Sequence, residues 1–190
     1  MPQTSAMTRS RPSRHGCSWR ERRATRQPTP WRWRPRSPQV PPVRIVLLRT
    51  ADREGLVFHT HRLSRKAVEM EAHPEVALLL HWNRPIHRQV GVEGRAERLE
   101  DELSDAYFFE RPAGGRPSAW ASPQSQVVSG RDELERRWQE ARCRFPDDGA
   151  IPRPAEWGGY RVVPECFEFW QGREDRLYDR IRFRRAATPG

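Results

Sequence analysis

Strand-like segments separated by short turns make up much of this chain after residue 42. Val76–Trp82 is a continuous apolar run, and Ile86–Leu99, beyond a turn over residues 83–85, alternates side chains between two faces. A continuous apolar run predicts a buried strand, and alternation predicts a strand with two different faces. Strands joined by so short a turn pair antiparallel, because a parallel connection needs a crossover of about a dozen residues. The chain therefore predicts an antiparallel sheet rather than a doubly wound one.

Further strands are predicted on both sides of this pair. They are Val43–Arg49 with Leu56–Thr60, which form a hairpin, then Trp157–Val163, Phe167–Trp170 and the second strand of a hairpin over residues 168–180. In that last strand Arg176, Tyr178 and Arg180 share one face, because successive side chains point to opposite sides. Two guanidiniums beside a phenol suit an anion, although the same pattern is typical of a solvated edge strand. Gly91 and Gly94 predict a bulge in the strand over residues 86–99.

Three short helices are predicted between the strands, over residues 65–73, 101–110 and 131–145. Ser64 is a favoured N-cap for the first helix, and Pro74 ends it. Arg65 and Lys66 then lie in the first turn, where the helix dipole disfavours cations unless a phosphate binds there. A solvated helix start is the alternative. Together these elements predict a mostly β (α+β) fold, a barrel with short peripheral helices.

Residues 1–42 differ from the rest of the chain in composition. They hold ten arginines and one acid, Glu21, and so carry +9 of the net charge of +10. With eight of the 18 prolines and no periodicity, the segment predicts a disordered tail. Its Arg and Trp residues would suit single-stranded nucleic acid, but we do not expect nucleic acid as a partner. Since Lys66 is the chain's only lysine, as in a GC-rich gene, a second hypothesis is that this segment is out-of-frame translation.

The remaining sequence excludes several classes of protein. Cys17, Cys143 and Cys166 are odd in number and far apart, which favours free thiols and a cytoplasmic location over a disulfide framework or a zinc site. No apolar run approaches the roughly 20 residues needed to cross a bilayer, so no membrane association is expected. Phosphate-binding glycine loops, zinc-protease motifs and nucleophile elbows are missing, and the histidines have no metal-ligand spacing. We therefore expect no metal.

Eight blocks of sequence, in order from Val43 to about Phe183, carry a resemblance to a known family. They are Arg44–Arg49, Ser64–Lys66, Arg88–Val90, Tyr107–Pro112, Ala119–Trp120 with Gln124–Ser125, Trp157–Tyr160, Glu168–Gly172 and Arg176–Arg180. Together they resemble the pyridoxamine/pyridoxine 5'-phosphate oxidase family. The resemblance implies an FMN-binding split β-barrel, a homodimer with FMN at the subunit interface, and oxidation of pyridoxamine or pyridoxine 5'-phosphate to pyridoxal 5'-phosphate with O2. It divides the chain into the tail over 1–42, an FMN-binding core over 43–145, and a C-terminal dimerisation segment over 146–190 that completes the barrel and the active site.

The resemblance also implies roles for individual residues. FMN would be bound by Arg44, Ile45, Val46, Leu47, Leu48, His59, Thr60, Arg65, Lys66, Gln89, Gln124, Ser125, Trp170 and Arg180. The substrate would be bound by Arg49, Tyr107, Arg111, Gly115, Arg176, Leu177 and Tyr178, with Arg176 and Tyr178 as the catalytic candidates. These residue types suit the chemistry, because a phosphate dianion is bound well by guanidinium and ammonium groups and a flavin edge by amides.

Three positions on the substrate side depart from the family pattern. The family usually has Lys at the position of Arg49, Ser at that of Gly115 and His at that of Tyr178. The last change is the largest, because an imidazole titrates near pH ~6.5 and a phenol near ~10. Two alternatives therefore stay open: a related FMN-dependent oxidase acting on another substrate, such as a phenazine precursor, and an inactive flavin-binding dimer. Both ends of the chain also depart from the family, and a barrel without its end strands is expected to expose sheet edges and fold poorly.

Overall fold

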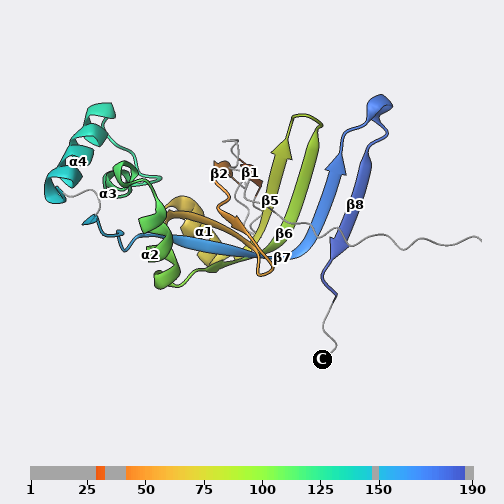
Figure 1. Ribbon diagram of the computed structural model, residues 1–190, viewed down its shortest axis with the longest axis horizontal. Coiled ribbons are helices and arrows are strands. Elements are labelled where there is room, and N and C mark those ends of the chain that lie inside the picture. The colour runs from red at the N-terminus through yellow and green to blue at the C-terminus, as the bar shows by residue number, and fades with distance from the viewer. Residues whose placement is uncertain (1–28, 33–41, 147–149, 187–190) are drawn as a thin grey trace, which may run out of the picture.

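A computed structural model describes residues 29–32, 42–146 and 150–186, and in these residues eight strands form one antiparallel sheet (Figure 1). The strands are β1 (Thr29–Arg32), β2 (Val43–Val46), β3 (Thr50–Ala51), β4 (Leu56–His61), β5 (Glu75–Trp82), β6 (Arg88–Arg98), β7 (Trp157–Gln171) and β8 (Asp179–Arg184). Their order is β2-β1-β5-β6-β7-β4-β3, with β8 also paired to β7. All of these pairings are antiparallel, which confirms the predicted fold class.

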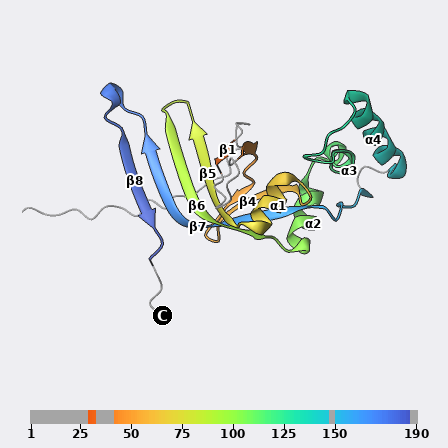
Figure 2. The ribbon, with the colours of Figure 1, turned by 180° about the vertical axis from the view of Figure 1, so that it is seen from behind.

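The helices lie toward one end of the sheet. They are α1 (Arg65–Ala72), α2 (Asp101–Glu110), α3 (Pro117–Ala121) and α4 (Arg131–Arg144), with the 3-10 turn η1 (Ala113–Gly115). A second 3-10 turn, η3 (Glu174–Arg176), lies between β7 and β8. Both views show α2, α3 and α4 at one end of the molecule and the β7–β8 hairpin at the other (Figure 1, Figure 2). The predictions for α1, α2 and α4 are confirmed. Helix α3 was not among the predicted helices; it begins at Pro117, whose fixed φ suits a first helical turn.

Strand β7 connects the two ends of the molecule. It is 15 residues long, and β6 pairs with it from Tyr160 to Gln171. On its other edge, β4 pairs with residues 157–162 and β8 pairs with residues 166–171. The sequence predicted two strands here, but the structure has one. Pro164 has no N–H to donate to the ladder. The strand can continue through it because the register shifts at the predicted bulge, where Gly94 of β6 is its partner.

The hydrophobic core lies between α1 and the central strands. Its buried members are Leu56, Phe58, Ala67, Met70, Val76, Leu78, Val92, Ala96, Tyr160 and Val162. Phe58 of β4 stacks on Tyr160 of β7 with 5.8 Å between ring centroids. Burial of side chains from β4, β5, β6 and β7 against one helix holds the sheet and α1 together.

The first predicted hairpin is wrong in its pairing. The strand that pairs with β4 is the two-residue β3, whereas Val43–Val46 pairs with β1. The turn before β4 explains this, because the Asp52 carboxylate accepts the N–H groups of Glu54 and Gly55 and so reverses the chain there. The expected disordered tail over residues 1–42 is likewise corrected at Thr29–Arg32, whose backbone pairs with both β2 and β5. Residues 1–28 and 33–41 lie outside the described part of the chain.

The predicted common face of Arg176, Tyr178 and Arg180 is also wrong. Only Arg180 lies in a strand, because the turn η3 extends to Arg176 and strand β8 begins at Asp179. Asp175 and Arg176 have φ angles of 57° and 60°, in the left-handed region, so they cannot be part of a strand with alternating side chains. Arg176 therefore does not belong to the strand alternation that includes Arg180.

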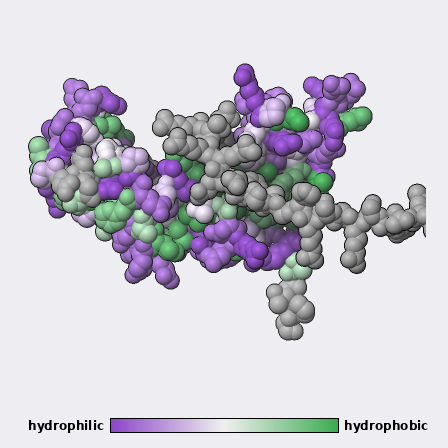
Figure 3. Space-filling view, in the orientation of Figure 1, coloured by the Kyte–Doolittle hydropathy of each residue, from purple (hydrophilic) through white to green (hydrophobic). Residues whose placement is uncertain are grey.

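Several apolar side chains are exposed on the strands. They include Val43, Ile45 and Leu47 near β2, and Phe169, Ile181 and Phe183 on β7 and β8. In the space-filling view, hydrophobic residues appear as small separate areas among more extensive hydrophilic surface (Figure 3). None of the described helices is long and apolar enough to cross a membrane.

The bulge on β6 generates the first prediction. A Cβ atom at Gly94 would overlap the backbone carbonyl oxygen of Val163, so Gly94→Ala must displace one of the two strands. We expect this variant to lose about 1–3 kcal/mol of stability and to melt several degrees lower by circular dichroism. Gly114→Ala is the control, because an added Cβ there meets nothing within 4 Å. Equal melting temperatures for the two variants would contradict the role assigned to the bulge.

Candidate functional site

A first group of polar side chains surrounds the start of α1. The Lys66 ammonium donates to Thr60 Oγ1 at 2.7 Å, to Gln124 Oε1 at 2.8 Å and to Ser64 Oγ at 3.1 Å. Ser64 occupies the predicted N-cap position, but its side chain makes no capping hydrogen bond. Instead, the Arg65 backbone N–H donates to Ser125 Oγ at 3.1 Å. Strand β4, helix α1 and the loop after α3 thus meet at one place.

Two arginines complete this group, which we call the cation cluster: Arg44, Arg65 and Lys66. A cavity of about 510 Å³ adjoins the cluster, and its lining includes Arg44, Lys66, Gln124 and Ser125. Burial, and secondarily the charge of Arg44, lowers the pKa of Lys66 to about 8. Burial is also the main cause that lowers the pKa of Arg44. Lowered pKa values mean that these cations lack full compensation, so the cluster favours an anion.

A second group, the ring stack, consists of three nearly parallel rings with guanidinium groups against two of them. Tyr107 of α2 stacks on His59 of β4 with ring centroids 4.0 Å apart, and His59 lies 4.9 Å from Trp157 of β7. The Arg49 guanidinium lies 5.3 Å from the Tyr107 ring centroid, and that of Arg111 lies 5.2 Å from the Trp157 centroid. The ring stack therefore has one arginine against Tyr107 and a second against Trp157.

Unpaired buried atoms mark this second group as incomplete. In the described part of the chain, Nη1 of Arg111 and both ring nitrogens of His59 are buried without a hydrogen-bond partner. Nη2 of Arg111 donates to the Gly115 carbonyl at 3.0 Å, which brings Gly115 to the same place. Desolvation, with the charges of Arg49, Arg111 and Arg153, lowers the pKa of His59 to about 4, so its ring is neutral at pH 7. Burial raises the pKa of Tyr107, which keeps its hydroxyl proton available as a donor.

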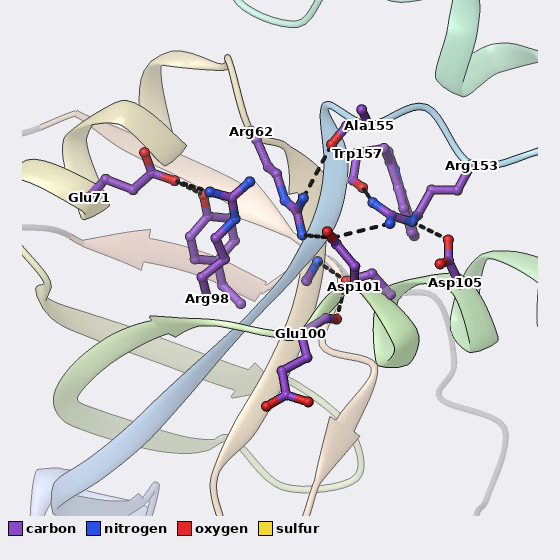
Figure 4. Close-up of polar contacts among 12 residues, drawn as sticks. Arg62, Glu71, Arg98, Glu100, Asp101, Asp105, Arg153, Ala155 and Trp157 are labelled. Carbon is purple, nitrogen blue, oxygen red and sulfur yellow. Dashed lines mark hydrogen bonds and ion pairs between the residues drawn. The ribbon is translucent and has the colours of Figure 1, made fainter.

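An ionic network attaches α2, which carries Tyr107, to the start of β7 (Figure 4). Arg62 donates to Asp101 at 2.6 Å, and Arg153 contacts Asp101 at 3.1 Å, Asp105 at 2.5 Å and the Trp157 carbonyl at 2.6 Å. The hydrogen bond from Arg62 is the main cause that lowers the pKa of Asp101. Arg153 is about fifty residues from α2 in the sequence, so local patterns could not predict this pairing.

A third group lies at the far end of β7. Gln89, Trp170 and Arg180 are paired across β6, β7 and β8, and the Trp170 and Tyr178 rings lie against each other at a tilt, with centroids 4.8 Å apart. A cavity of about 610 Å³ is lined here by Trp82, Ile86, Gln89, Phe169, Trp170 and Ile181, among others. Arg180 faces Glu168 at 3.7 Å, and the Leu177 side chain is 79% exposed. Arg176 precedes Leu177 in the turn η3.

A single chain does not bring the three groups together. The first two groups lie near α1 and α2, whereas the third lies at the tip of the β6–β7–β8 sheet (Figure 1). Trp157 and Trp170 are thirteen residues apart on one strand, which corresponds to about 40 Å of extended chain. Residues predicted to bind one ligand are thus divided between two ends of the molecule. Trp157 in the stack and Glu69, which contacts two of the cations, were not among the predicted site residues.

The geometry and comparisons with known proteins agree on the class of protein. This sheet with short helices is the split-barrel fold of FMN-binding proteins. It superposes on a Nostoc punctiforme protein that is described as pyridoxamine 5'-phosphate oxidase-related and FMN binding. The TM-score is 0.56 at 13% identity, over 83% of this chain and 87% of that one. Residues 33–144 match the family model described as "Pyridoxamine 5'-phosphate oxidase". Residues 157–190 match that of the pyridoxine 5'-phosphate oxidase C-terminal dimerisation region. The chain belongs to the pyridoxamine 5'-phosphate oxidase family, and membership indicates a flavin cofactor.

Individual relatives support the same assignment. Proteins named pyridoxine/pyridoxamine 5'-phosphate oxidase from Cupriavidus necator and Rubrobacter xylanophilus are 54% and 52% identical over 144 and 145 residues, 76% of this chain in each case. The chain spans 66% of the length of each of these relatives. The structure of PhzG from Burkholderia lata, in complex with tetrahydrophenazine-1-carboxylic acid, superposes with a TM-score of 0.75 at 29% identity, over 84% of this chain and 76% of that one.

Among the described residues, no group of three or more His, Cys, Asp and Glu side chains is arranged to hold a metal ion.

Proposed function

We propose that this protein is an FMN-dependent oxidase that converts pyridoxamine 5'-phosphate or pyridoxine 5'-phosphate to pyridoxal 5'-phosphate, with O2 as the electron acceptor. The observation that carries the proposal is the presence of two separate anion-binding groups, the cation cluster at α1 and the arginine-capped ring stack at α2. A flavin phosphate and a substrate phosphate need one site each. The names of relatives that are 52% and 54% identical support the same reaction.

The cation cluster fits the phosphate of FMN. Arg44, Arg65 and Lys66 would donate charge-assisted hydrogen bonds, and Ser125 and Gln124 would complete the site with neutral groups. The backbone of residues 45–48, beside the cluster, would follow the flavin, with Thr60 holding the Lys66 ammonium in place. When bound, FMN would supply the two-electron chemistry that the side chains cannot.

The ring stack fits the substrate phosphate. Arg49 and Arg111 would donate to its oxygens, and Tyr107 would add the hydroxyl proton that burial retains. The unpartnered Nη1 of Arg111 would then be satisfied. Gly115 offers no side-chain hydroxyl there, so its contribution is the carbonyl that orients Arg111. The resemblance assigned His59 to FMN binding. Its contacts with Tyr107 and Trp157 support a role in the ring stack better than a role at FMN.

The third group would come from a second copy of the chain. Gln89, Trp170 and Arg180 would approach the flavin ring, and Arg176, Leu177 and Tyr178 the substrate, only if the tip of one chain reaches the cation cluster of another. The exposed apolar side chains on β2, β7 and β8 would be covered in such a homodimer. In this arrangement residues 43–145 form the flavin-binding core and 146–190 the dimerisation segment. We further infer a cytoplasmic location, which the free thiols of Cys143 and Cys166 support.

One experiment tests the proposed function. The purified protein is expected to show a flavin absorption spectrum, with FMN at one per chain. Anaerobic addition of pyridoxine 5'-phosphate should then bleach the flavin, and O2 should restore its colour. A protein that binds no flavin would refute the proposal, and a coloured protein that is not bleached would refute the assigned substrates.

A second candidate is an FMN-dependent oxidase of a phenazine precursor. It is favoured by the three substrate-side departures at Arg49, Gly115 and Tyr178 and by the likeness to PhzG. Bleaching by tetrahydrophenazine-1-carboxylic acid, but not by pyridoxine 5'-phosphate, would favour this candidate.

The pKa of Lys66 predicts how FMN binding depends on pH. Since this pKa is lowered to about 8, the ammonium loses its proton as pH rises through that value, and the phosphate loses a cationic partner. We expect the affinity for FMN to fall between pH 7 and pH 9, as measured by flavin fluorescence titration. In Lys66→Arg the charge persists to a higher pH, so the fall should be smaller. Parallel profiles for the two proteins would contradict this assignment.

The departure at Tyr178 predicts a change in turnover. A phenol is a poor base near neutral pH, whereas an imidazole titrates near pH ~6.5. We therefore expect Tyr178→His to raise kcat on pyridoxine 5'-phosphate several-fold at pH 7.5, by analogy with general-base effects of about 10²-fold or more. Tyr178→Phe is the control and should not gain. Equal rates for the two variants would indicate that this position takes no part in proton transfer.

A further inference from the structure

Glu69 contacts two members of the cation cluster at once. Its Oε1 lies 2.7 Å from Nε of Arg65, and its Oε2 lies 3.3 Å from Nη2 of Arg44. Each carboxylate oxygen therefore binds a different guanidinium, one from β2 and one from α1. The side chains of Glu69 and Arg44 are 17% and 23% exposed and that of Arg65 is 57% exposed, so the contact with Arg44 is the less solvated of the two.

The geometry leaves both arginines able to bind a ligand. Arg65 donates to Glu69 from its Nε, and Arg44 donates to Glu69 from its Nη2. A guanidinium has five N–H donors in a planar fork. Because each arginine commits one nitrogen to the carboxylate, the other nitrogens stay available. Glu69 thus orients the two groups without blocking them.

The charges of the group also match a phosphate. In the described part of the chain, Lys66 has no ion pair with an acid, and Glu69 is the acid that pairs with Arg44 and Arg65. Three cations and one carboxylate leave a net charge of +2 at the cluster. A phosphate monoester carries about −1.5 to −2 at pH 7. Without Glu69, the guanidiniums of Arg44 and Arg65 would face each other with no anion between them, and like charges at close range repel.

We propose that Glu69 is a positioning residue for the phosphate of the cofactor, which it serves by holding Arg44 and Arg65 at a fixed separation. It does not touch the phosphate. This inference rests on the proposed function, because it assumes that the cation cluster binds the FMN phosphate. It predicts that Glu69 matters for FMN and not for riboflavin, the same ring system without the phosphate.

The test compares the affinities of the full-length protein for FMN and riboflavin by fluorescence titration. For Glu69→Ala we expect FMN affinity to fall about tenfold, the size of one or two lost charge-assisted hydrogen bonds, with riboflavin affinity unchanged. Glu69→Gln keeps the volume and one acceptor, and its loss should be about threefold by the same reasoning. The ratio of the two affinities is the decisive quantity, because a general loss of folding would lower both.

Glu71→Gln provides a matched control. Glu71 is on the same helix, and its carboxylate accepts from the Tyr160 hydroxyl at 2.8 Å rather than contacting the cation cluster. The substitution changes the net charge by the same amount as Glu69→Gln, and the ratio of FMN to riboflavin affinity should not change. A drop of the ratio in this control would show that net charge alone is responsible and would overturn the proposal.

Two further outcomes separate the inference from the proposed function. If the unmodified protein binds FMN more tightly than riboflavin and the Glu69 variants keep the same ratio, or raise it, then Glu69 does not position the arginines and only this inference fails. If the unmodified protein fails to prefer FMN to riboflavin, the phosphate assignment of the cation cluster fails, and the inference fails with it.

Discussion

The division of β7 between two partner strands determines the shape of this protein. One edge of β7 is paired with β6 from Tyr160 to Gln171, while the other edge is shared by β4 and β8. Such sharing requires the strand to continue past Pro164, and the bulge at Gly94 permits this because the ladder there needs no donor from the proline. The two ends of the sheet can then diverge while one hydrogen-bonded ladder joins them. The helical end and the hairpin tip become separate surfaces of the same sheet.

That separation explains how charge is distributed along the chain. At the helical end, partial burial of Lys66, Arg44 and Arg111 lowers the pKa of each group, and few acids lie near them. A folded protein tolerates such incomplete compensation where a ligand supplies the missing charge. In the β7–β8 hairpin, Arg173 pairs with Asp179 near the turn, and Arg182 pairs with Glu93 of β6 nearer the bulge. Arginines with incomplete compensation are thus found at the helical end, where Arg62 and Arg153 are nevertheless paired with Asp101 and Asp105.

Much of the fold could be predicted because it depends on local patterns. The run at Val76–Trp82, the alternation that follows it and the helix ended by Pro74 are properties of neighbouring residues, and the structure has these elements. Predictions failed where the partner strand decided the outcome. Val43–Val46 pairs with β1, in a segment that had no strand pattern, instead of β4, and Pro164 does not end its strand because its partner Gly94 on β6 has a matching bulge.

The sequence by itself determined the family, the residue types suited to phosphate and flavin, and the three substrate-side departures at Arg49, Gly115 and Tyr178, because motifs and spacing are written in the order of residues. Only the tertiary structure decided which of these residues meet. It brings Thr60, Lys66 and Gln124 together, puts His59 between Tyr107 and Trp157, and adds Glu69 to the arginines. It also separates Gln89, Trp170 and Arg180 from the cation cluster, because an extended strand of 15 residues lies between the two ends. Proximity in space depends on how strands pair, and strand pairing is a property of the whole sheet.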